Sequence, residues 1–184
     1  KPVDGEASLG HVMDAIRILR GELTDTPLIG FCGAPFTVAS YMIEGGPSKD
    51  YKMAKSMMYN TPEVWHAFME KLTAVLIDYL TAQIRAGAQV VQLFDSWVGA
   101  LNPQDYETFA LPYSKKVLDA AHATGVPVIH FGVGATTLLP LMKKAGGDIL
   151  GLDWRIPLDD GWKIIGHDRG VQGNLDPVPL FSTP

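Results

Sequence analysis

The sequence predicts an α/β protein built on a parallel sheet. Short apolar runs alternate with segments of helical periodicity, in the order βαβαβαβαβ. Alternation of this kind favours right-handed crossovers, in either a doubly wound sheet or a (β/α) barrel. No repeat, linker or low-complexity tract interrupts the pattern, so residues 1–184 are expected to belong to a single domain.

Five runs rich in apolar or β-branched residues are expected to be strands, because each is followed by Gly, Pro or Asp and then by helical periodicity. They cover residues 28–31, 89–94, 126–131, 148–152 and 170–173. Closing an eight-stranded barrel typically takes ~250 residues, so five strand–helix units would form only part of one.

The clearest helix has Thr61 as its N-cap, Pro62 at its first position and Gly87 after its end. A shorter helix is expected just before it. Pro112 should divide a helical region that Asn102-Pro103 opens and Gly125 closes. The other expected helices cover residues 51–59, 136–145 and 158–165.

Composition excludes several classes of function. Hydrophobic residues make up 47% of the chain and charged residues 19%, as in a globular protein. The net charge is −5 and the Lys and Arg residues are scattered, which argues against binding of nucleic acid or anionic lipid. Apolar stretches are interrupted well before the ~20 residues of a membrane span. The N-terminus lacks an initiator Met and any signal-peptide pattern, and the C-terminus stops where a helix could begin, so both chain ends are expected to be cut.

A single cysteine, Cys32, rules out an intrachain disulfide and a zinc site that needs several thiolates. This fits a reducing compartment, so a cytoplasmic location is expected. Cys32 could be a nucleophile with His130 as its base, but no motif places the pair, and a small buried thiol is the favoured interpretation.

Residues that follow the strands are candidates for a site, because ligands of parallel α/β proteins bind beyond the carboxyl ends of the strands. Taken alone, Ser96 would be a turn residue and Asp153 an N-cap. Polar and aromatic residues nevertheless occupy or follow the ends of several strands, which favours a pocket. They include Phe31, Cys32, Phe94, Ser96, Trp97, His130, Phe131, Asp153 and Asn174.

Residues 132–137 imitate a dinucleotide-binding fingerprint, with Asp153 about twenty residues later. The third glycine is absent, so a nicotinamide site is only a weak alternative. Tyr41 lies ten residues past the first strand, where a sharp turn at Gly45-Gly46 could direct it to the strand ends. Spacing alone leaves it equally open that Tyr41 is a core residue.

Six motifs, in order, resemble uroporphyrinogen decarboxylases. They are GFCGAPFT at residues 30–37, YMIEGG at 41–46, QLFDS at 92–96, FALPY at 109–113, GLDW at 151–154 and QGNLDP at 172–177. The resemblance implies a (β/α)₈ barrel, of which this chain holds about five units. It also implies a homodimer in haem and chlorophyll precursor synthesis that decarboxylates uroporphyrinogen III to coproporphyrinogen III with no metal or organic cofactor.

By this resemblance, Tyr41 is catalytic and binds substrate, Ser96 binds substrate carboxylates or neighbouring catalytic groups, and Phe31 and Phe94 line the tetrapyrrole cleft. The family's N-terminal arginines, its aspartate for the pyrrole N–H groups and its C-terminal histidine match nothing here. The 184-residue chain alone is therefore expected to be inactive. Corrinoid and thiol methyltransferases of the same superfamily hold zinc with His and Cys, which a lone Cys32 cannot do. A half-barrel with no activity of its own remains the non-enzymatic alternative.

Overall fold

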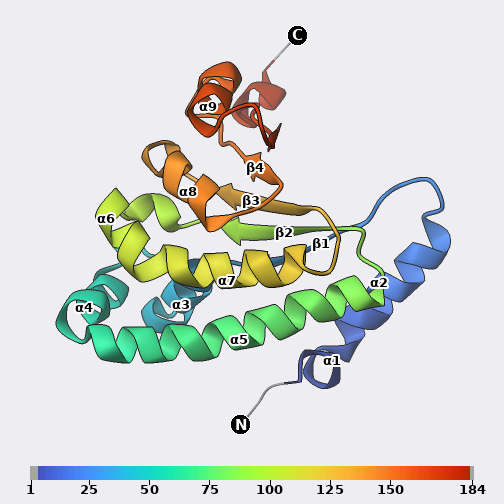
Figure 1. Cartoon of the computed structure of the whole chain (residues 1–184), viewed down its shortest axis with the longest axis horizontal. Helices are drawn as coiled ribbons and strands as arrows, with labels where there is room; N and C mark the ends of the chain where they lie inside the picture. Colours follow the sequence, from blue (N-terminus) through green and yellow to red (C-terminus); the bar gives the residue numbers. More distant parts are fainter. Residues whose placement is uncertain (1–3, 183–184) are drawn as a thin grey trace.

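The computed structural model describes residues 4–182 and contains a parallel five-stranded sheet with helices packed against it (Figure 1). Each predicted strand is present, with its ends shifted by at most two residues. The strands are β1 (Ile29–Gly33), β2 (Val90–Asp95), β3 (Val128–Gly132), β4 (Ile149–Gly151) and β5 (Gly170–Gln172).

The order of the strands separates the two predicted architectures. Neighbours in space are neighbours in sequence, β1-β2-β3-β4-β5, and every pair is parallel. A doubly wound sheet reverses its order at a switch point, whereas a (β/α)₈ barrel does not. The described strands show no reversal and do not close on each other. The prediction of a partial (β/α)₈ barrel is confirmed, and the doubly wound alternative is wrong.

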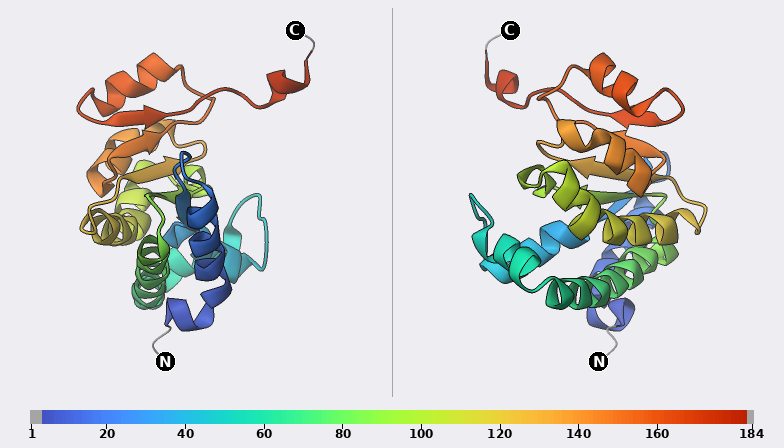
Figure 2. Two further views of the ribbon diagram at one scale, coloured as in Figure 1. Left: turned by 90° about the vertical axis from the view of Figure 1, so that its right-hand side faces the viewer. Right: turned by 60° about the vertical axis from the view of Figure 1, so that its left-hand side comes forward.

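The helices that lead from each of β1 to β4 to the next strand lie along one side of the sheet. Figure 2 shows α5, α7, α8 and α9 succeeding one another there. The α-helices are α1 (Gly5–Ser8), α2 (Gly10–Glu22), α3 (Pro35–Glu44), α4 (Lys52–Asn60), α5 (Pro62–Ala86), α6 (Pro103–Asp105), α7 (Leu111–His122), α8 (Leu139–Ala145) and α9 (Leu158–Ile165). Short 3₁₀ turns are η1 (Val98–Ala100), η3 (Thr136–Leu138) and η4 (Val178–Phe181), and η2 (Tyr106–Ala110) is a π segment.

Helix α5 has the ends that the sequence predicts. Pro62 occupies the first turn, where its missing N–H costs nothing, and Gly87 ends the helix with φ +120°. Trp65, Met69 and Leu80 on its buried side join the main core.

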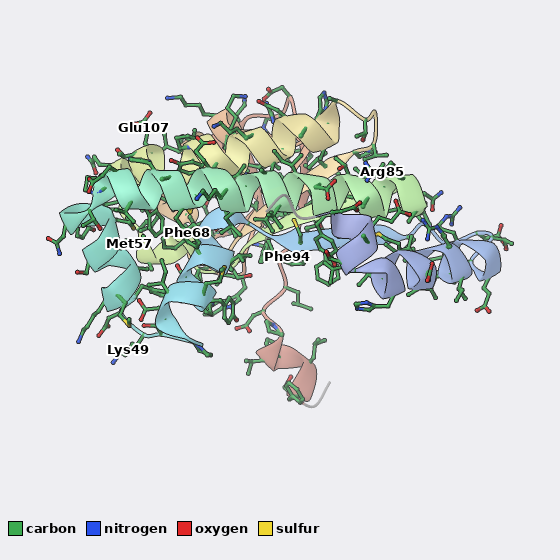
Figure 3. All side chains as sticks on the ribbon, turned by 90° about the horizontal axis from the view of Figure 1, so that it is seen from below. Lys49, Met57, Phe68, Arg85, Phe94 and Glu107 are labelled. Atoms are coloured by element: carbon green, nitrogen blue, oxygen red, sulfur yellow. The ribbon has the colours of Figure 1, made fainter. Side chains whose placement is uncertain are left out.

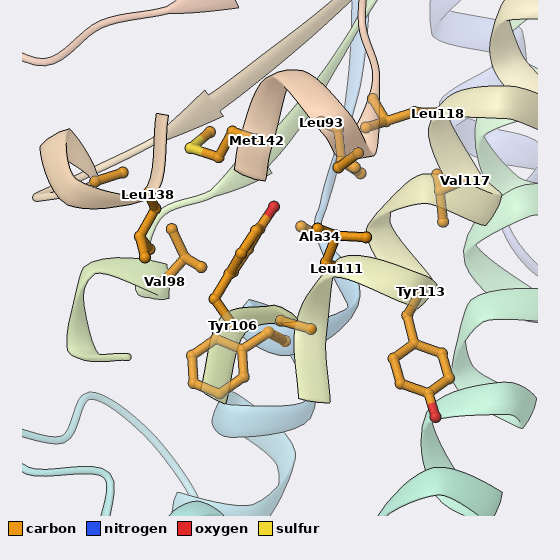
Figure 4. Close-up of a cluster of buried hydrophobic side chains, with 14 of the residues drawn as sticks. Ala34, Leu93, Val98, Tyr106, Leu111, Tyr113, Val117, Leu118, Leu138 and Met142 are labelled. Atoms are coloured by element: carbon orange, nitrogen blue, oxygen red, sulfur yellow. The ribbon is translucent and has the colours of Figure 1, made fainter. Parts of the chain in front are cut away.

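Pro112 divides the next helical region as predicted. Proline cannot donate to the carbonyl one turn earlier, and a π segment fills the turn before α7. This segment places Tyr106 in the centre of the core (Figure 4), where its ring is fully buried among Val98, Leu138 and Met142.

Three helices were not predicted from the sequence. They are α1, α2 and α3. The first two pack on α5, and α2 does so through a small separate core. The third is flanked by two recognisable signals, Pro35 at its start and Gly45 at its end with φ 76°. The sequence predicts that both chain ends are cut. Residues 1–3 and 183–184, on which this expectation partly depends, lie outside the described residues.

Candidate functional site

The two faces of the sheet differ in burial. Cys32, Leu93 and His130 are aligned across β1, β2 and β3 and are buried beneath the helices. Side chains alternate between faces along a strand, so Phe31, Phe94 and Phe131 lie on the opposite face. Phe31 is 59% exposed. This second face would line the interior of a closed barrel.

The three phenylalanines form a row across β1, β2 and β3. Ring centroids are 5.6 Å apart for Phe31 and Phe94 and 5.8 Å for Phe94 and Phe131, and both pairs meet edge to face. Such contacts are favourable because the ring edge is positive and the ring face negative. Figure 3, where Phe94 is labelled, views this region from the side of α5. The row gives the site an apolar aromatic wall.

Two further residues hold this wall in place. The Gln83 amide on α5 accepts a hydrogen bond from the Phe31 backbone N–H at 3.0 Å and donates one to the Phe31 carbonyl at 2.8 Å. On β4, a Cβ at Gly151 would lie 2.7 Å from the Phe131 ring, so only glycine leaves room for that ring.

Tyr41 lies at the carboxyl ends of the strands and stacks on Trp97, with ring centroids 3.7 Å apart. Tyr41 belongs to α3, which begins directly after β1, and Trp97 follows β2. The sequence interpretation attributed this placement to the Gly45-Gly46 turn, and that reason was wrong. Gly45 only ends α3, while Tyr41 is positioned by the helix itself.

Ser96 is half-buried in the turn between β2 and Trp97. Its sequence neighbours connect it to the other predicted site residues, because Phe94 precedes it by two positions and Trp97 contacts Tyr41. Tyr41, Ser96, Phe94 and Phe31 therefore belong to one region at the ends of β1 and β2. Trp97 and Phe131 extend it.

A buried carboxyl group, Asp95, lies beneath this region on the helix side of β2. It accepts hydrogen bonds from Thr37 Oγ1 at 3.0 Å and from Ser114 Oγ at 3.4 Å. Burial raises the pKa of Asp95 to about 7, although both hydroxyl groups favour the charged form. Burial likewise raises the pKa of Tyr106 above its usual value, and the nearby Asp95 adds to the effect. Neither Asp95 nor Thr37 was singled out from the sequence.

The loops after β3 and β4 are joined by Asp153. Its carboxylate accepts hydrogen bonds from the Gly134 N–H at 2.5 Å and from Arg155 Nη1 at 2.7 Å. Asp153 is therefore not the helix N-cap that it would be if taken alone. The Arg155 guanidinium lies 4.6 Å from the ring centroid of Trp154, so it is held both by an ion pair and by a cation–π contact.

The same contact argues against a dinucleotide site at residues 132–137. In such a site the backbone N–H groups of the loop bind phosphate. Here the Gly134 N–H is already bonded to Asp153, whose carboxylate would repel a phosphate.

Cys32 and His130 do not form a catalytic pair. Leu93 lies between them in register, so they are two strands, or roughly 10 Å, apart. Burial raises the pKa of the Cys32 thiol to about 12 and lowers the pKa of His130 to about 4. The favoured interpretation of Cys32 as a buried core thiol is confirmed.

One hollow lies away from these residues. It measures about 410 Å³ and is lined by Lys115, His122, Asp148 and Arg169 among others. Asp148 and Arg169 immediately precede β4 and β5, which places the hollow at the amino ends of the strands. Ligands of this fold bind at the carboxyl ends, so we assign the site to the aromatic region.

Comparison with known proteins identifies the family. The family model described as "Uroporphyrinogen decarboxylase (URO-D)" matches residues 1–184. A uroporphyrinogen decarboxylase of Carboxydothermus hydrogenoformans is 57% identical over 178 residues, covering 96% of this chain and 51% of that protein. One from Myxococcus xanthus is 54% identical over 181 residues, covering 98% and 51%. The chain belongs to the uroporphyrinogen decarboxylase family, and it spans about half the length of these relatives.

A solved structure supports the fold. A methyltransferase from Methanosarcina mazei superposes with a TM-score of 0.78 at 22% sequence identity, over 89% of this chain and 48% of that one. At this identity the likeness concerns the fold alone. Among residues 4–182, none of the helices combines the length and apolar character that crossing a bilayer requires.

Proposed function

We propose that the protein to which this chain belongs is a uroporphyrinogen decarboxylase. It would remove the carboxyl groups of the four acetate side chains of uroporphyrinogen III and yield coproporphyrinogen III, in haem and chlorophyll precursor synthesis. Family membership supports this activity. The structural observation that carries it is the row of Phe31, Phe94 and Phe131 beside the Tyr41–Trp97 pair, at the ligand-binding end of a barrel.

The reaction determines what such a site must do. When CO₂ leaves, the electron pair of the broken bond needs an acceptor, and a pyrrole protonated next to the acetate-bearing carbon can provide it. The substrate is then its own electron sink. The protein has to bind an octa-anionic macrocycle, deliver a proton and stabilise the cationic pyrrole.

Different residues of this chain are proposed to perform these tasks. Phe31 and Phe94, together with Phe131, offer apolar ring surface to the macrocycle. Tyr41 is proposed as the catalytic and substrate-binding hydroxyl, since its ring is fixed by Trp97 while 47% of the residue is exposed. Ser96 is proposed to bind a substrate carboxylate or a neighbouring catalytic group.

Several properties of the whole protein remain proposals. By family resemblance we infer a single barrel domain, a homodimer and no metal or organic cofactor. The single cysteine supports a cytoplasmic location, and the scattered basic residues argue against nucleic acid as a partner. The arginines, aspartate and histidine of the family site match no position here, so the 184 residues alone are proposed to lack activity.

The test uses the full-length protein with uroporphyrinogen III under anaerobic conditions, and products are separated by chromatography according to their number of carboxyl groups. We expect intermediates with seven, six and five carboxyl groups and then coproporphyrinogen, at the same rate before and after thorough chelation. Absence of decarboxylation would refute the activity. Activity lost on chelation and restored by a metal would refute the cofactor-free mechanism.

A further inference from the structure

Thr37 connects the buried carboxyl group to the surface of the site. It lies on α3 and is 4% exposed. Its Oγ1 donates a hydrogen bond to Asp95 Oδ1 at 3.0 Å and accepts one from the Trp97 backbone N–H at 3.2 Å. The hydroxyl thus joins the last residue of β2 to the turn that follows it.

Helix α3 also contacts the outer side of the turn after β2. Tyr41 is four residues after Thr37, one helical turn along the same side of α3, and stacks on the Trp97 ring. Trp97 is therefore held at two points, by its N–H at Thr37 and by its ring at Tyr41. Tyr51 contacts the same ring with centroids 5.2 Å apart.

We propose that Thr37, oriented by Asp95, is a positioning residue of the decarboxylase site. Its hydroxyl fixes the position of the turn after β2 relative to α3. This position places Trp97 against Tyr41 and directs Ser96 to the substrate. The inference rests on the proposed function for its catalytic consequence, but the placement of Trp97 can be tested without it.

Physical chemistry explains why a hydroxyl is needed here. Valine has nearly the shape of threonine but can neither accept from the Trp97 N–H nor donate to Asp95. Each partner would then lose one hydrogen bond in a water-poor environment, and Asp95 would keep only the one from Ser114. The turn would shift to recover a partner for the Trp97 N–H. Serine retains the hydroxyl and should preserve both bonds.

The experiment compares Thr37→Val, Thr37→Ser and Thr73→Val in the full-length protein. Thr73 is a matched control, because it is 1% exposed on α5 and its hydroxyl has no hydrogen-bond partner among the described residues. We expect Thr37→Val to lower kcat roughly three- to tenfold, less than the ~10²-fold loss that misplacing a catalytic group by an ångström can cause. KM should stay within about twofold, because the phenylalanine row that is proposed to contact the macrocycle is unchanged. Thr37→Ser and Thr73→Val should match the wild type.

Two measurements separate positioning from general damage. In a Tyr41→Phe background, Thr37→Val should lower kcat by a smaller factor than in the wild type, because both changes affect one unit. The near-ultraviolet circular dichroism of Trp97, obtained as the difference from Trp97→Phe, should change in Thr37→Val and not in Thr73→Val.

An unchanged Trp97 signal in Thr37→Val would overturn the proposal, whatever substrate the enzyme uses. So would wild-type kcat in Thr37→Val, or a Thr37→Ser variant as impaired as Thr37→Val. A wild-type protein that does not decarboxylate uroporphyrinogen would refute the proposed function instead, and the dichroism would still decide whether Thr37 places Trp97.

Discussion

The ring of Tyr41 stacks on the ring of Trp97, with centroids 3.7 Å apart and planes inclined by 31°. This contact joins the helix after β1 to the turn after β2. Stacking uses the ring faces, so the Tyr41 hydroxyl can still make hydrogen bonds in the plane of its ring. Ring and hydroxyl can therefore be tested separately.

If the proposed function holds, we expect Tyr41→Phe to lower kcat of the full-length protein by roughly tenfold. This is less than the ~10²–10³-fold loss seen when one central transition-state hydrogen bond is removed, because several donors share the task. Phenylalanine keeps the stack on Trp97 and removes only the hydroxyl. Ser96→Ala should have the smaller effect, because a water molecule can replace a serine hydroxyl at the rim of a site. Steady-state decarboxylation rates provide the measurement.

Melting temperatures of both variants serve as the control and should stay close to the wild-type value. A fully active Tyr41→Phe variant together with an inactive Ser96→Ala variant would show that the two roles are assigned wrongly.

Asp95→Asn should change how stability depends on pH. Burial raises the pKa of Asp95 to about 7 from an ordinary value of 3.8, and the groups that face it are the Thr37 and Ser114 hydroxyls and Tyr106. Between these two pH values the unfolded chain has lost a proton that the folded chain keeps. Wild-type stability should therefore fall as pH rises from about 4 to about 7, by about 1.4 kcal/mol per pH unit at most from this group.

Asparagine is neutral throughout and lacks this contribution. The melting temperature of Asp95→Asn minus that of the wild type should therefore increase between pH 5 and pH 8. A difference that stays constant or decreases would mean that Asp95 does not keep its proton in the folded protein near neutral pH.

Local sequence signals were sufficient for the strands and for α5, because hydrophobic periodicity and the Pro62 and Gly87 signals are properties of short segments. The order of the strands was not predictable from periodicity, since βα alternation suits a barrel and a doubly wound sheet equally. The motifs that resemble the family predicted the barrel. Helix α3 was missed, although Pro35 and Gly45 mark its ends.

Within the site, strand-end residues could be found from the sequence, but their contacts could not. The Tyr41–Trp97 stack and the Asp95–Thr37 hydrogen bond join residues 56 and 58 positions apart, so they depend on tertiary packing. One signal was available for Asp95. Side chains alternate between the two faces of a strand, so Asp95 points to the face opposite Phe94, which is the helix-facing side of β2. A carboxyl group buried there needs hydrogen-bond partners.

The contact between the loops after β2 and β3 predicts an intolerance to side chains at Gly99. A Cβ there would lie 2.4 Å from the Val133 carbonyl oxygen and 2.8 Å from that of Gly134. These are backbone atoms and cannot rotate away. Gly99→Ala should therefore lower the free energy of unfolding by roughly 1–3 kcal/mol, as overpacking does.

Gly21→Ala is the matched control, because nothing lies within 4 Å of a Cβ at this position of α2. It should be neutral or stabilising by up to about 1 kcal/mol. Urea unfolding of the two full-length variants gives both values. Equal stability of Gly99→Ala and Gly21→Ala would show that the two loops are farther apart than described.

The last prediction concerns residues 1–184 studied alone. In the described part of the chain, β1 and β5 each have one side without a strand partner, and Ile29 and Phe31 are 45% and 59% exposed on the open face. Gln83 covers the backbone of Phe31 but leaves its ring exposed. Unpaired edges and apolar patches promote association.

We therefore expect the isolated chain to associate, to unfold without a sharp transition and to show no decarboxylase activity. Light scattering after gel filtration and thermal unfolding would measure this against the full-length protein. Phe31→Lys should reduce the association more than Val64→Lys, because both residues are about half exposed but only Phe31 lies on a strand at the edge of the sheet. A monomeric isolated chain that unfolds cooperatively would contradict the prediction, and equal effects of the two lysines would show that association does not proceed through the edge of β1.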